Sequence, residues 1–224
     1  IDDKPFMSNP RTCAATAPSV EADISSPAPA TMVTRTAQLP QPITGCGSLA
    51  LNNSVDVANT PTDAQQPTVF TAQVNQSAAP TQATLKTMQM AMPGFRLNAP
   101  AADGLSACTA AQLDAQSCPA SSEVGDAWID TQLLPLDSPN GHSLEGKVYL
   151  ETPGTATDGS DRYKLAVQLT GKTLITIRGI AAVNETTGDM VTTFDGLPDI
   201  PFTAFHLELQ GATNPLLINP ETCG

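Results

Sequence analysis

The sequence predicts an all-β protein, an antiparallel β-sandwich of Ig-like or Greek-key type. Short alternations of apolar and polar residues recur about every ten residues, and clusters of Gly, Pro, Asn and Asp separate them. Thr and Val, which favour strands, are abundant, whereas only 14% of the 224 residues are charged. The 40% share of apolar residues argues against a disordered chain.

The N-terminal part predicts a small hairpin module. Residues 19–24 alternate, residues 25–29 form a turn, and residues 31–37 return as a second short strand. A lone hairpin is marginal in water, so we expect a disulfide bond to hold it. A further strand over residues 49–57 leads through a polar linker to the main domain.

The main domain is predicted to begin near Thr68 and to contain most of the strands. Met88, Met90 and Met92 share one face, which we interpret as a core face rather than a ligand-binding methionine cluster. One short helix is expected between Cys108 and Cys118. The strands are expected at residues 69–74, 83–92, 124–131, 144–150, 163–169, 174–183, 190–194 and 202–210.

The same short sequence motif occurs at both ends of the chain. Residues 215–224 repeat residues 5–14 with Pro, Asn-Pro and Thr-Cys in register, and Cys13 and Cys223 lie 210 residues apart. We interpret the chain as one period of a tandem array. The predicted division is residues 1–13 as the end of a preceding repeat, 14–66 as the hairpin module with its linker, and 67–224 as the sandwich.

The five cysteines fit this interpretation. If Cys223 is the counterpart of Cys13, its partner lies in the following unit, and three pairings are open to the other four cysteines. We expect the two sequence-local pairs, Cys13–Cys46 and Cys108–Cys118, which indicate an oxidising, extracellular setting. A metal site is the weaker interpretation, because there is no Cys-x-x-Cys motif and no histidine close to a cysteine.

The charge of the chain limits its partners. A formal net charge of −12 argues against nucleic acid and anionic lipid, whose phosphates would repel this surface. No apolar run approaches the roughly 18 residues of a membrane-spanning helix. The expected partners are therefore neighbouring copies of the same repeat or subunit.

Four segments carry a resemblance to a known repeat family. They are residues 105–125 with Cys-x9-Cys-Pro-Ala-Ser, residues 144–150, residues 196–201, and residues 219–223. Together they resemble the repeat unit of very large secreted, cell-surface proteins of actinobacteria and related bacteria. In that family a Thr-rich hairpin and a second cysteine, here Cys46, follow the Asn-Pro-x-x-Cys segment. The resemblance implies an extracellular repeat and brings no catalytic residues.

Catalytic patterns are not evident in the sequence. Nucleophilic catalysis needs a Ser or Cys beside a His that a carboxylate holds, and no Gly-x-Ser-x-Gly motif occurs. We interpret His142 as a solvated loop residue and His206 as a strand surface residue. The sequence therefore predicts no enzymatic role and no cofactor.

Two other kinds of site are alternatives. Residues 158–161 and Asp195-Gly196 resemble fragments of calcium loops without the full ligand set, so turn formation is favoured over Ca²⁺ binding. A Lys–Asn isopeptide bond has candidates in Lys86, Lys147 and Lys172. It is disfavoured because disulfide bonds are expected to cross-link the chain already.

Three functions compete. The favoured one is structural: one repeat of about 210 residues in a long cell-surface fibre, filament or stalk, with adhesion as one use. The first alternative is a separate pilin-like subunit that polymerises by strand donation. The second is a carbohydrate- or protein-binding module, which needs an exposed aromatic platform. Trp128, Tyr149 and Tyr163 lie in strand patterns that predict burial instead.

Overall fold

The computed structural model divides the chain into two compact units. The smaller unit comprises residues 1–51 and 80–84, and the larger comprises residues 52–79 and 85–224. The structure describes residues 13, 16–25, 32–79, 81–155, 163–183, 186, 189–211 and 214–221.

The smaller unit contains an antiparallel hairpin of β1 (Ser19–Ser25) and β2 (Met32–Gln38). The register places Ile24 opposite Val33, so the predicted apolar residues share one face. Every residue of both strands is exposed. A two-stranded hairpin without a buried face gains little stability from packing, which agrees with the expected need for a disulfide bond.

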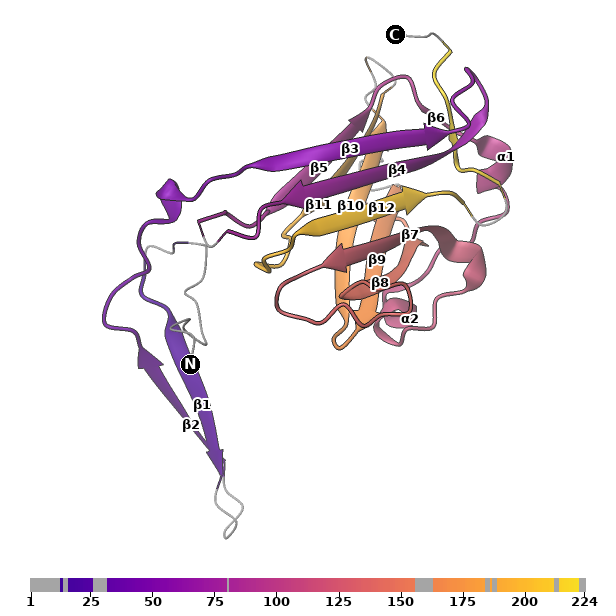
Figure 1. Cartoon of the computed structure of the whole chain (residues 1–224). Coiled ribbons are helices and arrows are strands. Elements are labelled where there is room, and N and C mark those ends of the chain that lie inside the picture. The colour runs from indigo at the N-terminus through magenta and orange to yellow at the C-terminus, as the bar shows by residue number, and fades with distance from the viewer. Residues whose placement is uncertain are drawn as a thin grey trace. The chain divides into compact units, whose positions relative to one another are not determined.

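The larger unit contains one continuous antiparallel sheet (Figure 1). Its order is β5, β11, β10, β9, β8, β7, β12, β4, β13 and β6, with β3 on the other edge of β4. The strands are β3 (Asn53–Thr60), β4 (Pro67–Gln76), β5 (Thr87–Met92), β6 (Arg96–Leu97), β7 (Glu123–Asp130), β8 (Leu144–Glu151), β9 (Tyr163–Gly171), β10 (Ile175–Val183), β11 (Met190–Asp195), β12 (Ala204–Leu209) and β13 (Leu217–Ile218). The all-β, antiparallel prediction is confirmed.

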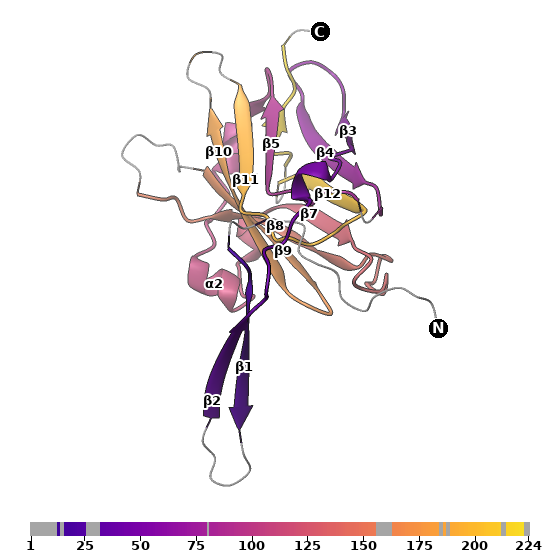
Figure 2. The ribbon, with the colours of Figure 1, turned by 90° about the vertical axis from the view of Figure 1, so that its left-hand side faces the viewer.

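Strands β7 to β11 form a meander, and β12 then returns to pair with β7. The sheet coils on itself, so that β3, β4, β12 and β7 form one layer and β9, β10, β11 and β5 cross behind it (Figures 1 and 2). This arrangement is consistent with a β-sandwich. It does not establish the Ig-like Greek-key topology that the sequence predicts.

One face of the coiled sheet forms the core. Along β4, Phe70, Ala72 and Val74 are buried, whereas the residues between them are half-buried, as an alternating strand requires. Leu207 of β12 and Phe194 of β11 are each 1% exposed and meet the same cluster from other parts of the sheet. The alternation that predicts the strands therefore also builds the core.

The methionine face of β5 belongs to this core, as predicted. Met92 is buried, and Met88 and Met90 pack against the buried cluster. The strand starts at Thr87 rather than at residue 83. The reason is that Thr81 and Ala83 form backbone hydrogen bonds with Ala50 of the smaller unit instead.

Strand β3 belongs to the larger unit, although residues 58–66 have the composition of a linker. It pairs with β4 from Asn53 opposite Gln76 to Thr60 opposite Val69. The chain therefore divides after Leu51 rather than at residue 66. Polar residues suit an edge strand because solvent reaches it, and composition alone does not separate such a strand from a linker.

The core-facing side of β3 is uncovered within the described residues. Val55 and Val57 lie in register with Val74 and Ala72 of β4 and so face the same side of the sheet. Their exposed fractions are nevertheless 61% and 63%. Strand β3 thus extends the sheet beyond its core.

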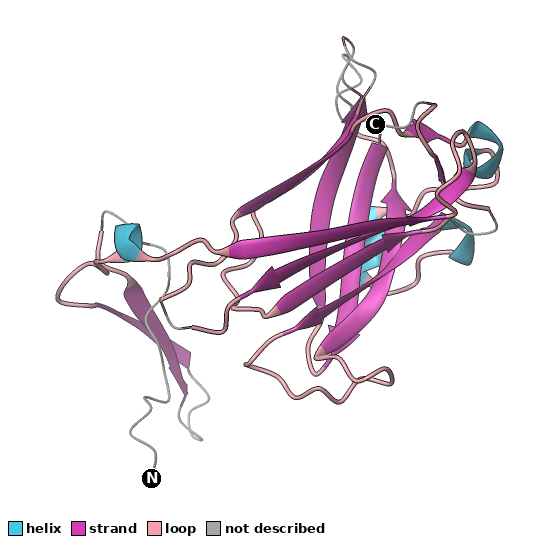
Figure 3. Ribbon diagram, turned by 45° about the horizontal axis from the view of Figure 1, so that its top comes forward, coloured by secondary structure: helices cyan, strands magenta, loops and turns pink. Residues whose placement is uncertain are grey.

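Two short α-helices, α1 (Ala99–Ala102) and α2 (Ala110–Asp114), and one 3-10 helix, η2 (Ala120–Ser122), complete the described part of the larger unit (Figure 3). The expected helix between Cys108 and Cys118 is α2, and it is shorter than the cysteine spacing allows. Gln116 ends it with a φ of 51°, a left-handed conformation typical of helix ends.

The contact between Gly179 and Phe194 gives a test of the core. These residues are cross-strand partners, and a Cβ on Gly179 would lie 2.6 Å from two ring carbons of Phe194. We expect Gly179→Ala to lower the free energy of unfolding by about 1–3 kcal/mol, measured by urea denaturation. A Gly104→Ala control, where nothing lies within 4 Å, should have a small effect.

The smaller side chain of a Phe194→Leu variant should relieve this clash. The double variant is therefore expected to be more stable than the sum of the two single changes predicts. Strict additivity would show that the ring does not oppose a Cβ at Gly179.

Candidate functional site

The first expected disulfide bond is present in the smaller unit. Cys13 and Cys46 are bonded, with their Cα atoms 5.7 Å apart. The backbone N–H of Cys46 also donates to Cys13 Sγ over 3.3 Å. Gly45, just before it, has a φ of 85°, which glycine adopts without steric cost. The bond closes the loop that contains the β1–β2 hairpin.

The second expected disulfide bond lies in the larger unit and encloses α2. Cys108 and Cys118 are bonded, with their Cα atoms 5.3 Å apart. A capping box starts the helix: the Gln112 N–H donates to Thr109 Oγ1, and the Thr109 N–H donates to Gln112 Oε1. The cap and the covalent bond together define a helix that is too short to be stable alone.

This clipped helix covers the outer face of β9. Leu113 is fully buried and packs with Ala166, while the side chain of Gln168 donates to the Leu113 carbonyl over 2.7 Å. The Leu113 carbonyl also accepts from the Gln116 N–H over 3.0 Å, so the side chain of Gln168 adds a second hydrogen bond that joins the end of the helix to β9. The clip therefore gives the sandwich a second, smaller core outside the sheet.

The C-terminal copy of the recurring motif contains Asn219. This polar residue is buried, with an exposed fraction of 1%. Its Nδ2 donates to the carbonyls of Pro61 and Asp63, each over 2.8 Å, and its Oδ1 accepts from Asn59 Nδ2 over 2.8 Å. Both amide hydrogens and the amide oxygen are thus used. The acceptors lie in the turn between β3 and β4.

The backbone around Asn219 is bound to the same turn. The Asn219 N–H donates to Gln66 O over 3.0 Å, and the Gln65 N–H donates to Pro220 O over 3.2 Å. Pro220 also lies against Gly94, where an added Cβ would come within 3.1 Å of the proline ring. We call Asn219 and Pro220 with residues 61–66 the C-terminal clasp. It holds the end of the sandwich to the β3–β4 turn.

Three features that the sequence singles out lie outside the described residues. They are Cys223, the calcium-like segment 158–161, and residues 5–14 apart from Cys13. The inter-unit disulfide bond of Cys223 therefore stays a prediction.

The two observed disulfide bonds indicate a non-cytoplasmic compartment, because cytosolic thiols are kept reduced. Among the residues that the structure places, no helix is both long enough and apolar enough to cross a membrane.

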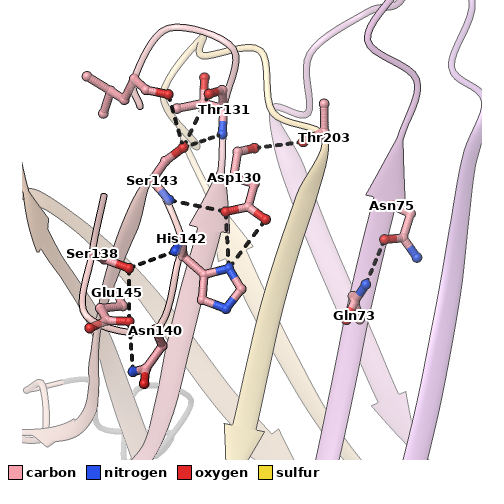
Figure 4. A network of polar contacts seen from close by, with 11 residues as sticks. Gln73, Asn75, Asp130, Thr131, Ser138, Asn140, His142, Ser143, Glu145 and Thr203 are labelled. Atoms are coloured by element: carbon pink, nitrogen blue, oxygen red, sulfur yellow. Dashed lines mark hydrogen bonds and ion pairs between the residues drawn. The ribbon is translucent and has the colours of Figure 1, made fainter. Parts of the chain in front are cut away.

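A polar network lies on the sheet at the end of β7 (Figure 4). His142 Nδ1 lies 3.1 Å from Asp130 Oδ1, and the same oxygen accepts from the Ser143 N–H over 3.1 Å. Ser143 Oγ accepts from the Thr131 N–H, and Ser138 Oγ accepts from the His142 N–H. His142 is half-buried and held, rather than the solvated loop residue that the sequence predicts.

The serine hydroxyl groups of this network form hydrogen bonds with backbone atoms and with a carboxylate. Ser138 Oγ donates to Glu145 Oε2 over 3.1 Å, and Ser143 Oγ donates to Thr131 O over 3.2 Å. Neither hydroxyl bonds to an imidazole, so the histidine and its carboxylate lack an aligned nucleophile here. The arrangement fixes a loop onto the sheet.

Trp128 stacks with both histidines on the outer face of the sheet. Its ring stacks on His142 at 3.8 Å between centroids and on His206 at 5.1 Å, with interplanar angles of 7° and 3°. His206 and Trp128 are direct cross-strand partners of β12 and β7. Because two imidazoles stack on the indole, its ring is not a free flat platform for a sugar ring.

The candidate lysines do not have the environment of an isopeptide bond. The hydrogen bond to Asp126, at 2.6 Å, raises the pKa of Lys147 above its ordinary value, with burial opposing it. A hydrogen bond to Asp137 raises the pKa of Lys172 in the same way. Lys86 is exposed. Protonated amines in contact with water are poor nucleophiles.

Asp195 acts as a turn residue. Its Oδ1 accepts from Thr87 Oγ1 over 2.6 Å, and Gly196 next to it has a φ of 65°. The hydrogen bond from Thr87 lowers the pKa of Asp195, and the backbone of Gly196 adds to this effect. Among the described residues no three metal-ligating side chains are grouped.

Comparisons with protein-family models, with curated proteins and with solved structures found no match to this chain.

Sequence reasoning missed the roles of two groups of residues. The role of Asn219 had a signal, because this residue is one of those that recur at both ends of the chain. The stack of Trp128 with His142 and His206 had none. It depends on a register between β7 and β12 that joins residues far apart in sequence.

The clasp can be tested through Asn219. We expect Asn219→Ala to lower the free energy of unfolding by about 2–4 kcal/mol in urea, because alanine removes three hydrogen bonds of a buried amide, to the Pro61 and Asp63 carbonyls and from Asn59. Asn214→Ala is the matched control, since Asn214 is exposed in the same segment, and should change stability by less than about 0.5 kcal/mol. Equal effects would contradict the clasp.

Low pH is expected to destabilise the larger unit through His206. Burial lowers the pKa of the His206 imidazole below its ordinary 6.5, with His142 acting in the same direction and Glu208 opposing. The folded state therefore binds fewer protons here than the unfolded state. The contribution of His206 to the free energy of unfolding is fully present above its ordinary pKa of 6.5. This contribution is lost as the pH falls through the lower pKa that His206 has in the folded state.

Urea unfolding at about pH 7.5 and about pH 5 measures this loss. His206→Phe keeps a flat ring against Trp128 but has no proton to bind, so the variant should lose less stability between these pH values. The same loss in both proteins would assign the pH dependence to other groups.

Proposed function

We propose that this protein is one unit of a long extracellular fibre on a bacterial cell surface, joined to its neighbours by the recurring Asn-Pro segment. The observation that carries this proposal is the C-terminal clasp. Asn219 uses all its amide groups on the β3–β4 hairpin of its own unit, with two acceptors in the turn and one donor, Asn59, in β3. Asn9 has the same place in the opening copy of the segment, so an equal role for it needs the turn of a second unit.

The Cys13–Cys46 bond extends this argument. Cys13 follows the opening copy of the segment as Cys223 follows the closing copy. In a tandem array, Cys223 of one unit therefore takes the place of Cys13 and bonds to Cys46 of the next. Each junction then combines the peptide chain, a clasp and a disulfide bond, which limits bending between units.

Two further observations support a structural role. The polar network around His142 ties a loop to the sheet and aligns no hydroxyl with an imidazole. The resemblance of the sequence to large secreted repeat proteins of actinobacteria points to the same class.

A second candidate is a pilin-like subunit that polymerises by strand addition, and β3 favours it. This eight-residue edge strand contains no Pro or Lys, and its single charge is Asp56. Val55 and Val57 are exposed on the core-facing side, where a donated strand would extend the sheet. The length of the native gene product separates the two candidates: many units indicate a tandem fibre, and about one unit indicates a subunit.

A duplicated chain tests the tandem junction. Residue 223 of the first copy is joined directly to residue 14 of the second, which keeps the 210-residue period. We expect non-reducing peptide mapping to find Cys223 of the first copy bonded to Cys46 of the second. Alkylation should then detect one free thiol, that of Cys223 in the second copy. Without the junction bond there would be three, because Cys223 of the first copy and Cys46 of the second would also be free.

The control is the same duplicated chain with Cys46→Ser in the second copy only, in which Cys223 of the first copy should stay free. A bond from Cys223 to Cys108 or Cys118, or a free Cys223 in the duplicated chain itself, contradicts the proposed junction.

A further inference from the structure

The larger unit contains an apolar cavity of about 330 Å³ at one end of its core. The walls come from several strands and from α1, and include Met92, Leu165, Ala181, Leu209 and Leu217. The volume is about twice the roughly 150 Å³ of a protein cavity known to hold benzene. It falls at the lower end of the range for small-molecule sites, about 300–1,000 Å³.

One polar atom in this wall has no partner. Thr192 lies on the core-facing side of β11, next to Ala181 of β10 in the register, and is 1% exposed. Its Oγ1 has no hydrogen-bond partner among the residues that the structure describes. A buried hydroxyl without a partner is costly, and valine of the same shape would avoid the cost.

The charged and polar residues of the cavity wall limit which ligands the cavity can bind. Arg96 is the charged residue of the lining, its side chain is 52% exposed, and its guanidinium pairs with Glu221. Tyr163, also in the lining, is 36% exposed. These two residues mark the rim, and the interior offers only apolar surface and the Thr192 hydroxyl.

We propose that this cavity binds a neutral, mostly apolar molecule of about two fused rings that carries one hydroxyl or carbonyl group. The apolar body fills the space between the strands, and its polar group exchanges a hydrogen bond with Thr192 Oγ1. Threonine both donates and accepts, so either group is recognised. This site is independent of the proposed fibre function, because it lies within one unit.

The test uses 2-naphthol and naphthalene, which differ by one hydroxyl group, and follows their fluorescence on titration with the full chain. We expect 2-naphthol to bind saturably and more tightly than naphthalene. Thr192→Val should weaken 2-naphthol about fivefold to tenfold and change naphthalene less than about twofold. Thr193→Val, on the next residue of the same strand, is the matched control and should leave both affinities unchanged.

A second variant, Ala181→Leu, fills the cavity from the neighbouring strand. It should abolish binding of both probes and, as a cavity-filling change, should not lower the melting temperature. The proposal is overturned if neither probe binds saturably, or if Ala181→Leu binds them as the wild type does. Equal affinities of both probes, unchanged by Thr192→Val, overturn the role of the hydroxyl group.

Discussion

The side-chain amide of Asn219 is the interaction on which the order of the larger unit depends most directly. It joins the end of the sandwich to the turn that begins β4, and β4 in turn carries β3 on one edge and β12 with β13 on the other. A buried amide is stable only when all its groups are paired, so this contact is specific as well as strong. The recurrence of the Asn-Pro pair at both ends of the chain gains a physical meaning from it.

Features that depend on local spacing were predictable from the sequence. Alternation predicts the buried sides of β4 and β5, and short spacing predicts the Cys13–Cys46 and Cys108–Cys118 bonds. Features that depend on long-range pairing were not. The stack of Trp128 with two histidines depends on the pairing of β7 with β12, a register that no local pattern encodes. Strand β3 was missed beyond Val57 for another reason, because its polar last residues have the composition of a linker.

The two faces of the sheet have different chemistry. The inner face is apolar apart from a few residues such as Thr192, whose unpaired hydroxyl lies beside an open volume. The outer face is covered at one place by the disulfide-clipped helix and carries stacked rings and hydrogen-bonded acids at another. A single sheet thus provides a core, a second small core and an ordered polar surface.

The two ends of β4 define how the sandwich responds to a pulling force. Strand β3 starts at Asn53 opposite Gln76, the last residue of β4, and β13 ends at Ile218 opposite Pro67, the first. Tension applied between these two points runs along β4 and loads the β3 ladder in shear. All hydrogen bonds of the β3–β4 ladder then bear the load together, instead of breaking one after another from one end.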